Sequence, residues 1–265
     1  MNAVVTQITN GDLVFRMPAP LPTRDDRWAI FFDVDGCLVE FQPAPELVKI
    51  PDAVRASLSD LQIVLAGAVA LVSGRTLDDL DNLFAPLILP SAGQYGMRRR
   101  SADGVLHSVL LPEKRVADFV RQRALETALR FPGLKVEDKG YSVALHYRKA
   151  PHLAGAAAAA AASIVASLGD AYEVQPGAMV QEIKPTTCSK GAAVRAFLAE
   201  PPFKSRTPVF LGDDFADESA FAAVNTLGGF SIAVGVDRFT QARYTLAGPA
   251  AARSWLANVV EALTH

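Results

Sequence analysis

The sequence is poor in cysteine, in excess charge of either sign and in long apolar runs, and each shortage excludes a class of protein. Its 265 residues include two cysteines, Cys37 and Cys188, too few for a disulfide framework and not spaced as a zinc site. The net charge of −2 and pI near 6.1 provide no basic field for nucleic acid or an anionic membrane. No apolar run approaches the roughly 18–20 residues of a membrane helix, and the first residues lack the pattern of a secretory signal. We therefore expect a soluble, cytoplasmic protein that binds neither nucleic acid nor membrane.

The composition that is present is that of a globular chain with a sizeable core. Hydrophobic residues make up 50% of the sequence and charged residues 20%, which is typical of a folded protein rather than a disordered one. Short apolar runs alternate with segments of helical periodicity, such as the one that Pro51 opens. Strands that are apolar on both faces and alternate with helices indicate a doubly wound parallel sheet of the α/β class. The runs are residues 28–33, 68–72, 208–211 and 230–234.

The middle of the chain has a different pattern and predicts an inserted domain. Residues 94–111 and 134–148 have the pattern of hairpins, with a helix expected around 112–130. The alanine-rich run of residues 154–162 favours a packed helix, because alanine is the best helix former. Hairpins and helices without parallel alternation indicate a small α+β module. We therefore expect a Rossmann-like core of residues 1–104 and 185–265, with an N-terminal arm of residues 1–25, and an inserted cap of residues 105–184.

Polar residues follow the apolar runs at the places where ligands bind in such a sheet. Asp33 and Asp35 follow one predicted strand. Ser73 and Asp213 follow two others, and ligands bind outside the carboxyl ends of parallel strands. Residues two apart on an extended segment face the same side, so both early aspartates can reach one site. Lys190 lies in the first turn of a predicted helix, where a cation opposes the helix dipole unless anions lie nearby.

Together, these residue types suit the hydrolysis of a phosphate ester. Two neighbouring carboxylates repel each other unless a cation neutralises them, and Mg²⁺ takes oxygen ligands alongside water and phosphate. Of the consecutive Asp213 and Asp214, we expect only one to face the metal. The hydroxyl of Ser73, the backbone N–H groups of its loop at Gly74, and Lys190 are expected to hold phosphate oxygens. The set predicts a carboxylate nucleophile, a neighbouring acid/base, Mg²⁺ and a phosphate clamp.

Four motifs in this order resemble those of the haloacid-dehalogenase superfamily of phosphatases. They are DVDGCL, SGR, SKG and GDDFADE, which begin at residues 33, 73, 189 and 212, and the resemblance covers about residues 28–245. The insertion between the second and third motifs is where the C2-type caps of this superfamily lie. Other segments resemble trehalose-6-phosphate phosphatases more narrowly: AGQYGMRRR (92–100), ALHYRKAP (144–151), QEIKPTTCSKG (181–191), RTPVFLGDDFADESAFAAVN (206–225) and LGGFSIAVG (227–235).

The resemblance implies Mg²⁺-dependent hydrolysis of trehalose 6-phosphate, in trehalose biosynthesis, through an aspartyl-phosphate. It assigns the nucleophile and one metal ligand to Asp33, and the acid/base to Asp35, whose backbone carbonyl is a second metal ligand. It makes Asp213 the third protein ligand of the metal. Ser73 and Lys190 are the implied catalytic residues that hold the phosphoryl group. In the cap, the residues expected to contact the sugar are Glu182, Arg148, His146 and Lys184.

Three positions depart from the residues common in this family. Cys37 is at a position where the family most often has threonine. Tyr95 replaces a common histidine, and Ala216 replaces a threonine. None of these removes a charged catalytic group, so they bear on substrate preference rather than on the reaction. The alternatives are a phosphatase for sucrose phosphate or mannosyl-phosphoglycerate, a phosphomutase, and a non-catalytic sugar-phosphate sensor or scaffold. The expected partner is a small disaccharide phosphate, and the sequence neither indicates nor excludes a synthase partner.

Two further predictions concern side chains near the motifs. Cys37 and Cys188 each lie two residues from a predicted catalytic residue. We therefore expect both thiols to border the site and to make activity sensitive to oxidation. The run Arg98–Arg100 is expected to form the solvated face of a hairpin.

Overall fold

The computed structural model describes residues 4–7, 13–42 and 47–265 of the chain. Contacts divide the chain into two compact units, Met1–His107 with Lys190–His265, and Ser108–Ser189. We call the first the core unit and the second the inserted unit. The core unit carries a ten-stranded sheet, and the inserted unit carries a four-stranded sheet. Within the described ranges, no helix combines the length and apolar character needed to cross a membrane.

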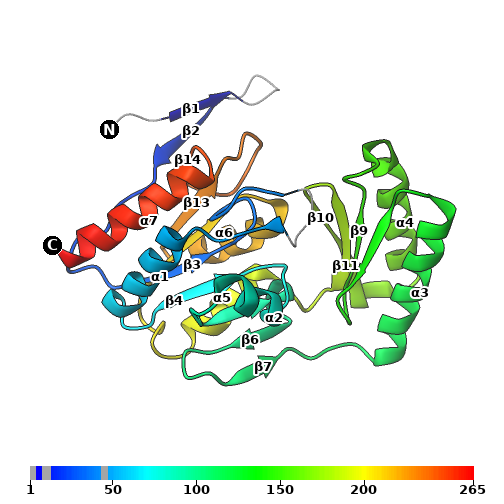
Figure 1. Cartoon of the computed structure of the whole chain (residues 1–265), viewed down its shortest axis with the longest axis horizontal. Coiled ribbons are helices and arrows are strands. Elements are labelled where there is room, and N and C mark those ends of the chain that lie inside the picture. The colour runs from blue at the N-terminus through cyan, green and yellow to red at the C-terminus, as the bar shows by residue number, and fades with distance from the viewer. Residues whose placement is uncertain (1–3, 8–12, 43–46) are drawn as a thin grey trace. The chain divides into compact units, whose positions relative to one another are not determined.

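The six central strands of the core unit, of which Figure 1 labels β3, β4, β13 and β14, are parallel. From β3 (Trp28–Phe32) the chain adds strands on one side, and from its neighbour β12 (Thr207–Gly212) on the other. The carboxyl ends of β3 and β12 therefore mark the topological switch point of the sheet. The predicted doubly wound parallel sheet is confirmed. The other strands of this sheet are β1 (Val4–Gln7), β2 (Leu13–Pro18), β4 (Val69–Val72), β5 (Ser91–Gly93), β6 (Arg98–Arg100), β7 (Leu106–Ser108), β13 (Phe230–Val234) and β14 (Tyr244–Leu246).

Two pairs of helices pack on this sheet. α1 (Asp52–Val64) packs against α7 (Pro249–Thr264), and α5 (Lys190–Leu198) packs against α6 (Glu218–Thr226). Each of these helices buries an apolar stripe, because residues three and four apart share one face of a helix. In α1 that stripe consists of Val54, Leu58 and Leu61, as the spacing predicted.

The remaining helical elements of the core unit are short and lie next to the polar motifs. α2 (Leu77–Phe84) follows β4 and begins with a capping box formed by Thr76 and Asp79. A single 3₁₀ turn, Phe215–Asp217, joins β12 to α6. These turns place the start of a helix at the carboxyl end of the preceding strand, where N–H groups are free of helical partners.

The segment after β5 differs from its prediction as a strand. Gln94–Gly96 forms a 3₁₀ turn, and the φ angles of Gln94 and Tyr95 are 50° and 58°. Non-glycine residues seldom adopt this left-handed region. Here the N–H of Gln94 donates to the carbonyl of Arg75 at 2.8 Å, and that of Tyr95 donates to the carbonyl of Ser73 at 2.9 Å. The turn is therefore held against the loop that follows β4.

Two of the three arginines of β6 depart from the predicted solvated face, and Arg98 is exposed as predicted. Arg99 is buried, forms an ion pair with Glu200, and lies 4.8 Å above the ring of Phe197. Arg100 is half-buried, and its guanidinium donates to both carboxylate oxygens of Asp81. The prediction was wrong because an arginine with a carboxylate partner can be buried, and sequence spacing does not reveal that partner.

The inserted unit is an antiparallel sheet with two helices packed on it. α3 (Lys114–Arg130) and the alanine-rich α4 (Ala154–Ala166) pack against strands of the sheet around a core that includes Val143, Leu145 and Ile183. The predicted alanine-rich helix is confirmed. The strands, in sheet order, are β10 (Tyr172–Gly177), β11 (Val180–Pro185), β9 (Val143–His146) and β8 (Lys135–Asp138), and single 3₁₀ turns cover Pro151–Leu153 and Gly169–Ala171.

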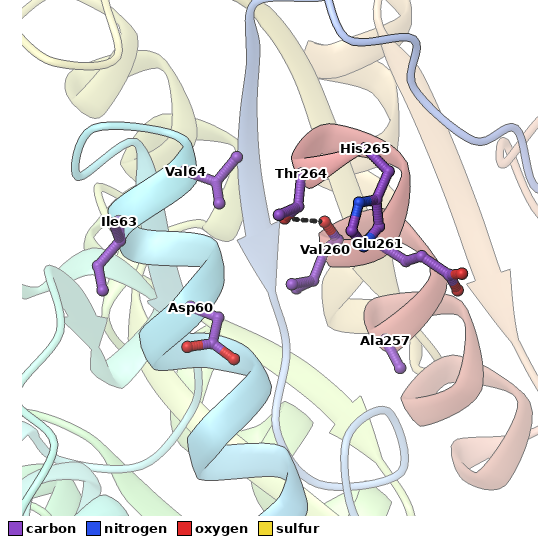
Figure 2. A pocket seen from close by; sticks show the side chains of 8 residues that line it. All are labelled: Asp60, Ile63, Val64, Ala257, Val260, Glu261, Thr264 and His265. Atoms are coloured by element: carbon purple, nitrogen blue, oxygen red, sulfur yellow. Dashed lines mark hydrogen bonds between the residues drawn. The ribbon is translucent and has the colours of Figure 1, made fainter.

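A groove of about 470 Å³ lies between the C-terminal halves of α1 and α7. Figure 2 shows its walls, which include Ile63 and Val64 from α1 and Val260 and Thr264 from α7. Both helices start near the carboxyl ends of the parallel strands and end near the amino ends of those strands. The groove therefore lies away from the polar motifs.

Candidate active site

Asp33 occupies the position that the sequence predicted, at the end of a fully buried strand. All five residues of β3 are buried, so the strand holds Asp33 at a fixed place, and only 5% of this residue is exposed. Its N–H donates to the carbonyl of Leu211 on β12 at 2.9 Å. Gly36 then turns the chain away with a φ of 82°, and a Cβ on it would lie 2.1 Å from a carboxylate oxygen of Asp213. Only glycine fits there, because the conformation and the close approach both exclude a side chain.

Lys190 joins two of the buried carboxylates. It is the first residue of α5 and is 3% exposed. Its Nζ lies 2.8 Å from Asp33 Oδ1 and 2.7 Å from Asp217 Oδ1. Burial alone would lower the pKa of Lys190, but the adjacent carboxylates of Asp217 and Asp33 outweigh it and hold that pKa above its ordinary value. The anions expected beside this lysine are therefore these aspartates.

The three aspartates Asp33, Asp213 and Asp217 form a cluster whose oxygens lie within 4.8 Å of one another. Burial raises the pKa of Asp33 to about 7 despite the opposing charge of Lys190. Burial, and then the charges of Asp33 and Asp217, raise the pKa of Asp213 to about 10. Burial is the larger cause of both shifts, and three ionised carboxylates beside one ammonium would also leave a surplus of two negative charges.

This cluster fits a divalent cation such as Mg²⁺. Among the described residues, Oδ1 of Asp213 is buried without a hydrogen-bond partner, and such an orphaned oxygen is costly unless a ligand meets it. A divalent ion would balance the surplus of two negative charges, and carboxylate oxygens are the ligands that Mg²⁺ prefers. Asp214 lies outside the cluster, as the N-cap of the 3₁₀ turn.

Asp217 is a residue that the sequence reasoning missed. Its Oδ2 accepts the N–H groups of Asp213 and Asp214, each at 3.0 Å, while its Oδ1 accepts from Lys190. Asp217 is fully buried. A signal was present, because Asp214 and Asp217 have the spacing of a capping box and form one in the structure.

The loop after β4 brings together Asp35, Ser73 and Gly74 with a second missed residue, Arg75. The guanidinium of Arg75 donates from Nε to Asp35 Oδ2 at 2.6 Å and from Nη2 to Asp35 Oδ1 at 2.7 Å. Both oxygens of Asp35 are engaged, so this bidentate pair fixes the direction of the carboxylate. Ser73 is 2% exposed, and its hydroxyl accepts the N–H of Arg75 at 3.2 Å.

Gly74 lies directly against Tyr95, one of the positions that departs from the resembled family. A Cβ at Gly74 would lie 2.8 Å from the hydroxyl oxygen of Tyr95. The loop that carries Ser73 is therefore contacted both by the side chain of Tyr95 and by the backbone of its turn. Close packing against this side chain, rather than an unusual φ angle, favours a glycine at this position.

The four predicted cap residues belong to the inserted unit, and three of them lie on one face of its sheet. Glu182 and Lys184 alternate along β11, and His146 pairs with Val180 of the same strand, so all three face away from the core side chain of Ile183. Arg148 lies beyond the end of β9 and donates to the carbonyl of Ala178 at 3.2 Å.

Each of these three side chains has an ionic or hydrogen-bonding partner. Glu182 is 2% exposed and accepts from Lys139 at 3.0 Å and from Ser142 at 2.8 Å. Lys184 pairs with Glu173, and His146 Nε2 lies 2.7 Å from Glu137. These partners were not identified from the sequence. They restrict the rotamers of the predicted sugar contacts.

Both cysteines are buried and free. Burial, and then the negative charge of Asp33, raises the pKa of Cys37 well above its ordinary value. Burial also raises the pKa of Cys188. Because the thiolate is the reactive form, these environments do not favour the oxidation-sensitive thiols that we expected.

Sequence comparisons with known proteins point to one family. The family model described as trehalose-phosphatase matches residues 31–250. Trehalose-6-phosphate phosphatase of Escherichia coli is 43% identical over 91% of this chain and 90% of its own length. A probable trehalose-phosphate phosphatase of Sinorhizobium fredii is 42% identical over 81% of this chain and 80% of its own length.

Solved structures support the same fold. The C-terminal domain of Candida albicans trehalose-6-phosphate phosphatase superposes with a TM-score of 0.80 at 20% identity, and the match covers 92% of this chain and 99% of that one. A haloacid dehalogenase-like hydrolase from Bacteroides thetaiotaomicron has a TM-score of 0.64 at 12% identity, over 89% of this chain and 100% of its own. The resemblance identified from the motifs is confirmed. With a haloacid-dehalogenase-like fold and matches of this extent, the chain belongs to the trehalose-phosphatase family of enzymes.

Proposed function

We propose that this enzyme hydrolyses trehalose 6-phosphate to trehalose and phosphate through an aspartyl-phosphate on Asp33. The observation that carries the proposal is the buried cluster in which Lys190 contacts Asp33 while Asp213 keeps an oxygen without a partner among the described residues. A nucleophile fixed on a buried strand, beside a permanent positive charge, suits attack on a phosphoryl group. The similarity to relatives named for trehalose-6-phosphate supplies the sugar.

In the first step a carboxylate oxygen of Asp33 attacks phosphorus, and the bond from phosphorus to the sugar oxygen breaks. Asp35 must carry a proton at this step, so one of its oxygens leaves Arg75 and gives that proton to the leaving oxygen, while Arg75 holds the other oxygen. In the second step water attacks the phosphorus of the aspartyl-phosphate, Asp35 takes a proton from that water, and the bond from phosphorus to the Asp33 oxygen breaks. Inorganic phosphate leaves, and Asp33 is regenerated. The hydroxyl of Ser73, the N–H of Gly74 and the ammonium of Lys190 hold the phosphoryl oxygens.

Asp33, Asp213 and the backbone carbonyl of Asp35 are the proposed protein ligands of Mg²⁺. Asp217 does not need to be a ligand, because Lys190 and two backbone N–H groups already engage both of its oxygens. When bound, Mg²⁺ supplies a positive charge that neutralises the phosphoryl oxygens. Asp217 positions Lys190 and the turn that carries Asp213.

The inserted unit is the proposed cap that recognises the disaccharide. Glu182, with its carboxylate held by Lys139 and Ser142, is the proposed contact to the sugar hydroxyls. His146, Arg148 and Lys184 are proposed to assist it. The proposed substrate is thus a small disaccharide phosphate, and the enzyme is proposed to act in the cytoplasm.

We expect Mg²⁺ to stabilise the folded protein, and to do so more strongly as the pH rises from 6 to 8. The raised pKa values of Asp33 and Asp213 mean that the metal-free fold binds more protons than the unfolded chain, so its stability falls as the pH rises through this range. Mg²⁺ must displace those protons when it binds. Fewer of them are bound at pH 8 than at pH 6, so Mg²⁺ binds more tightly at pH 8. At a free concentration of 100 times its Kd, a ligand contributes about 2.7 kcal/mol.

Differential scanning calorimetry with Mg²⁺ and with a chelator measures this effect. The difference in Tm between the two conditions should be several degrees and larger at pH 8 than at pH 6. An equal difference in Tm at pH 6 and pH 8 would contradict the proposal that the carboxyls of the metal site are protonated before Mg²⁺ binds.

A phosphate-release screen of sugar phosphates, with and without Mg²⁺, tests the function. Trehalose 6-phosphate should be hydrolysed with a higher kcat/KM than sucrose phosphate, mannosyl-phosphoglycerate or glucose 6-phosphate, and a chelator should abolish release. Preference for another sugar phosphate would retain the chemistry and replace the substrate. Binding of trehalose 6-phosphate without release of phosphate would instead indicate a sensor.

A further inference from the structure

Arg238 lies outside the four motifs and contacts two residues next to the acidic cluster, Glu218 and Phe215. It belongs to the loop that follows β13, and its Nη1 lies 2.6 Å from Oε1 of Glu218, the first residue of α6. Its guanidinium carbon lies 3.9 Å from the centre of the Phe215 ring. The other oxygen of Glu218 accepts the N–H of Gln241 from the same loop at 2.8 Å. Three contacts therefore join this loop to the turn between β12 and α6.

The two residues that Arg238 contacts lie on either side of Asp217. Phe215 begins the 3₁₀ turn and Glu218 directly follows it. Asp217 in turn binds the N–H groups of Asp213 and Asp214. Movement of this turn would therefore displace Asp213, one of the proposed metal ligands.

We propose that Arg238 is a positioning residue that holds the turn of residues 213–218 in the geometry needed to bind Mg²⁺. This inference depends on the proposed metal site. The ion pair is well shielded, with Arg238 and Glu218 side chains only 22% and 19% exposed, so it is stronger than a surface pair. Phe215 is 51% exposed, and the planar guanidinium stacked on its ring is a contact that lysine reproduces poorly.

The turn that Arg238 contacts has to hold closely spaced carboxylates in one place. Oxygens of Asp33, Asp213 and Asp217 lie within 4.8 Å of one another, and Asp213 and Asp217 both belong to this turn. The cost of ordering the turn is subtracted from the free energy of metal binding. Arg238 holds the turn closed before the metal arrives, and such preorganisation increases affinity without adding a ligand.

The test compares the Kd of Mg²⁺ for the resting enzyme, without substrate, by isothermal titration calorimetry. Residues that orient metal ligands typically change metal affinity about 10–100-fold when removed, and we expect Arg238→Met to raise the Kd about tenfold. Arg238→Lys should recover part of this loss through the pair with Glu218, and Phe215→Leu should lie between. At saturating Mg²⁺, kcat of all three should stay within about twofold of the wild type, so the effect should appear in the Mg²⁺ dependence.

Arg206→Met is the matched control. Arg206 also lies in the core unit and donates to the carbonyls of Pro202 and Trp28, at the amino ends of the parallel strands. Its loss should change the Tm but not the Kd of Mg²⁺. An unchanged Kd in Arg238→Met, or an equal rise in Arg206→Met, would overturn the proposal. Absence of Mg²⁺ binding by the wild type would instead refute the proposed metal site. If Arg238→Met does not fold, Arg238→Lys and Phe215→Leu decide the question by the same measurement.

Discussion

Replacing Asp33 with asparagine is expected to reduce the turnover of trehalose 6-phosphate by about 10⁴-fold or more. The amide has no charged oxygen to attack phosphorus, and the removal of a nucleophile that acts with its acid and phosphate clamp abolishes nearly all of the chemical step. The residual rate would come from positioning and from the charge of Lys190.

The same variant is expected to fold at least as stably as the wild type in the absence of metal. Asparagine has the shape of aspartate, and its carbonyl can still accept from Lys190. The substitution lowers the surplus negative charge of the cluster from two to one, and it removes the charge of Asp33, which acts after burial to raise the pKa of Asp213. Activity and stability should therefore change in opposite directions, a result that a merely damaged fold cannot give.

The measurements are single-turnover phosphate release and a thermal melt in the presence of a chelator. Asp60→Asn on α1 is a suitable control, because Asp60 lies in the groove far from the polar motifs; its turnover should equal that of the wild type. Turnover by Asp33→Asn within tenfold of the wild type would refute Asp33 as the nucleophile. Loss of activity together with a large fall in Tm would leave a folding defect as the explanation and refute the predicted gain of stability.

The parts of the fold that were predictable are those that a single segment determines. The strand Trp28–Phe32 is apolar at every position, and such a run is buried on both faces only in a central parallel strand. The carboxyl ends of such strands converge, so Asp33 and Asp213 could be placed in one site before any coordinates were known.

The parts that were not predictable depend on partners distant in the sequence. Arg75 directs Asp35 across 40 residues, and Arg99 is buried because Glu200 lies opposite, 101 residues away. The left-handed conformation of Gln94 and Tyr95 follows from hydrogen bonds to the loop after β4, whereas the flanking Gly93 and Gly96 indicate only that a turn lies there. A propensity describes one residue, whereas these features arise from the contact between two.

Asp217 illustrates both cases, because its capping signal is local and its partner Lys190 is 27 residues away. Alone, the spacing from Asp214 indicates only a helix start. Burial converts this cap into the support of the site, since a fully buried carboxylate needs every oxygen satisfied. Both oxygens of Asp217 accept hydrogen bonds, from one ammonium and two backbone N–H groups.

Replacing Asp217 with asparagine is therefore expected to damage both the fold and the reaction. The side-chain NH₂ must face either Lys190 or the N–H groups of Asp213 and Asp214. In both orientations it places a hydrogen-bond donor against another donor. Breaking a buried ion pair by removing one partner costs about 3–5 kcal/mol. Relief of repulsion with Asp213 offsets part of this, so we expect a loss of about 3 kcal/mol and a fall in kcat/KM of about 100-fold.

Urea unfolding with Mg²⁺ present and steady-state phosphate release measure the two effects. Asp214→Asn is the matched control on the adjacent cap, because asparagine caps a helix as well as aspartate does; it should lose less than about 1 kcal/mol and keep its kcat/KM within a few-fold. Equal behaviour of the two variants would show that Asp217 acts only as a cap. A larger loss at Asp217, in stability and activity together, is expected because its carboxylate holds the phosphate-binding lysine and the metal-binding turn in one geometry.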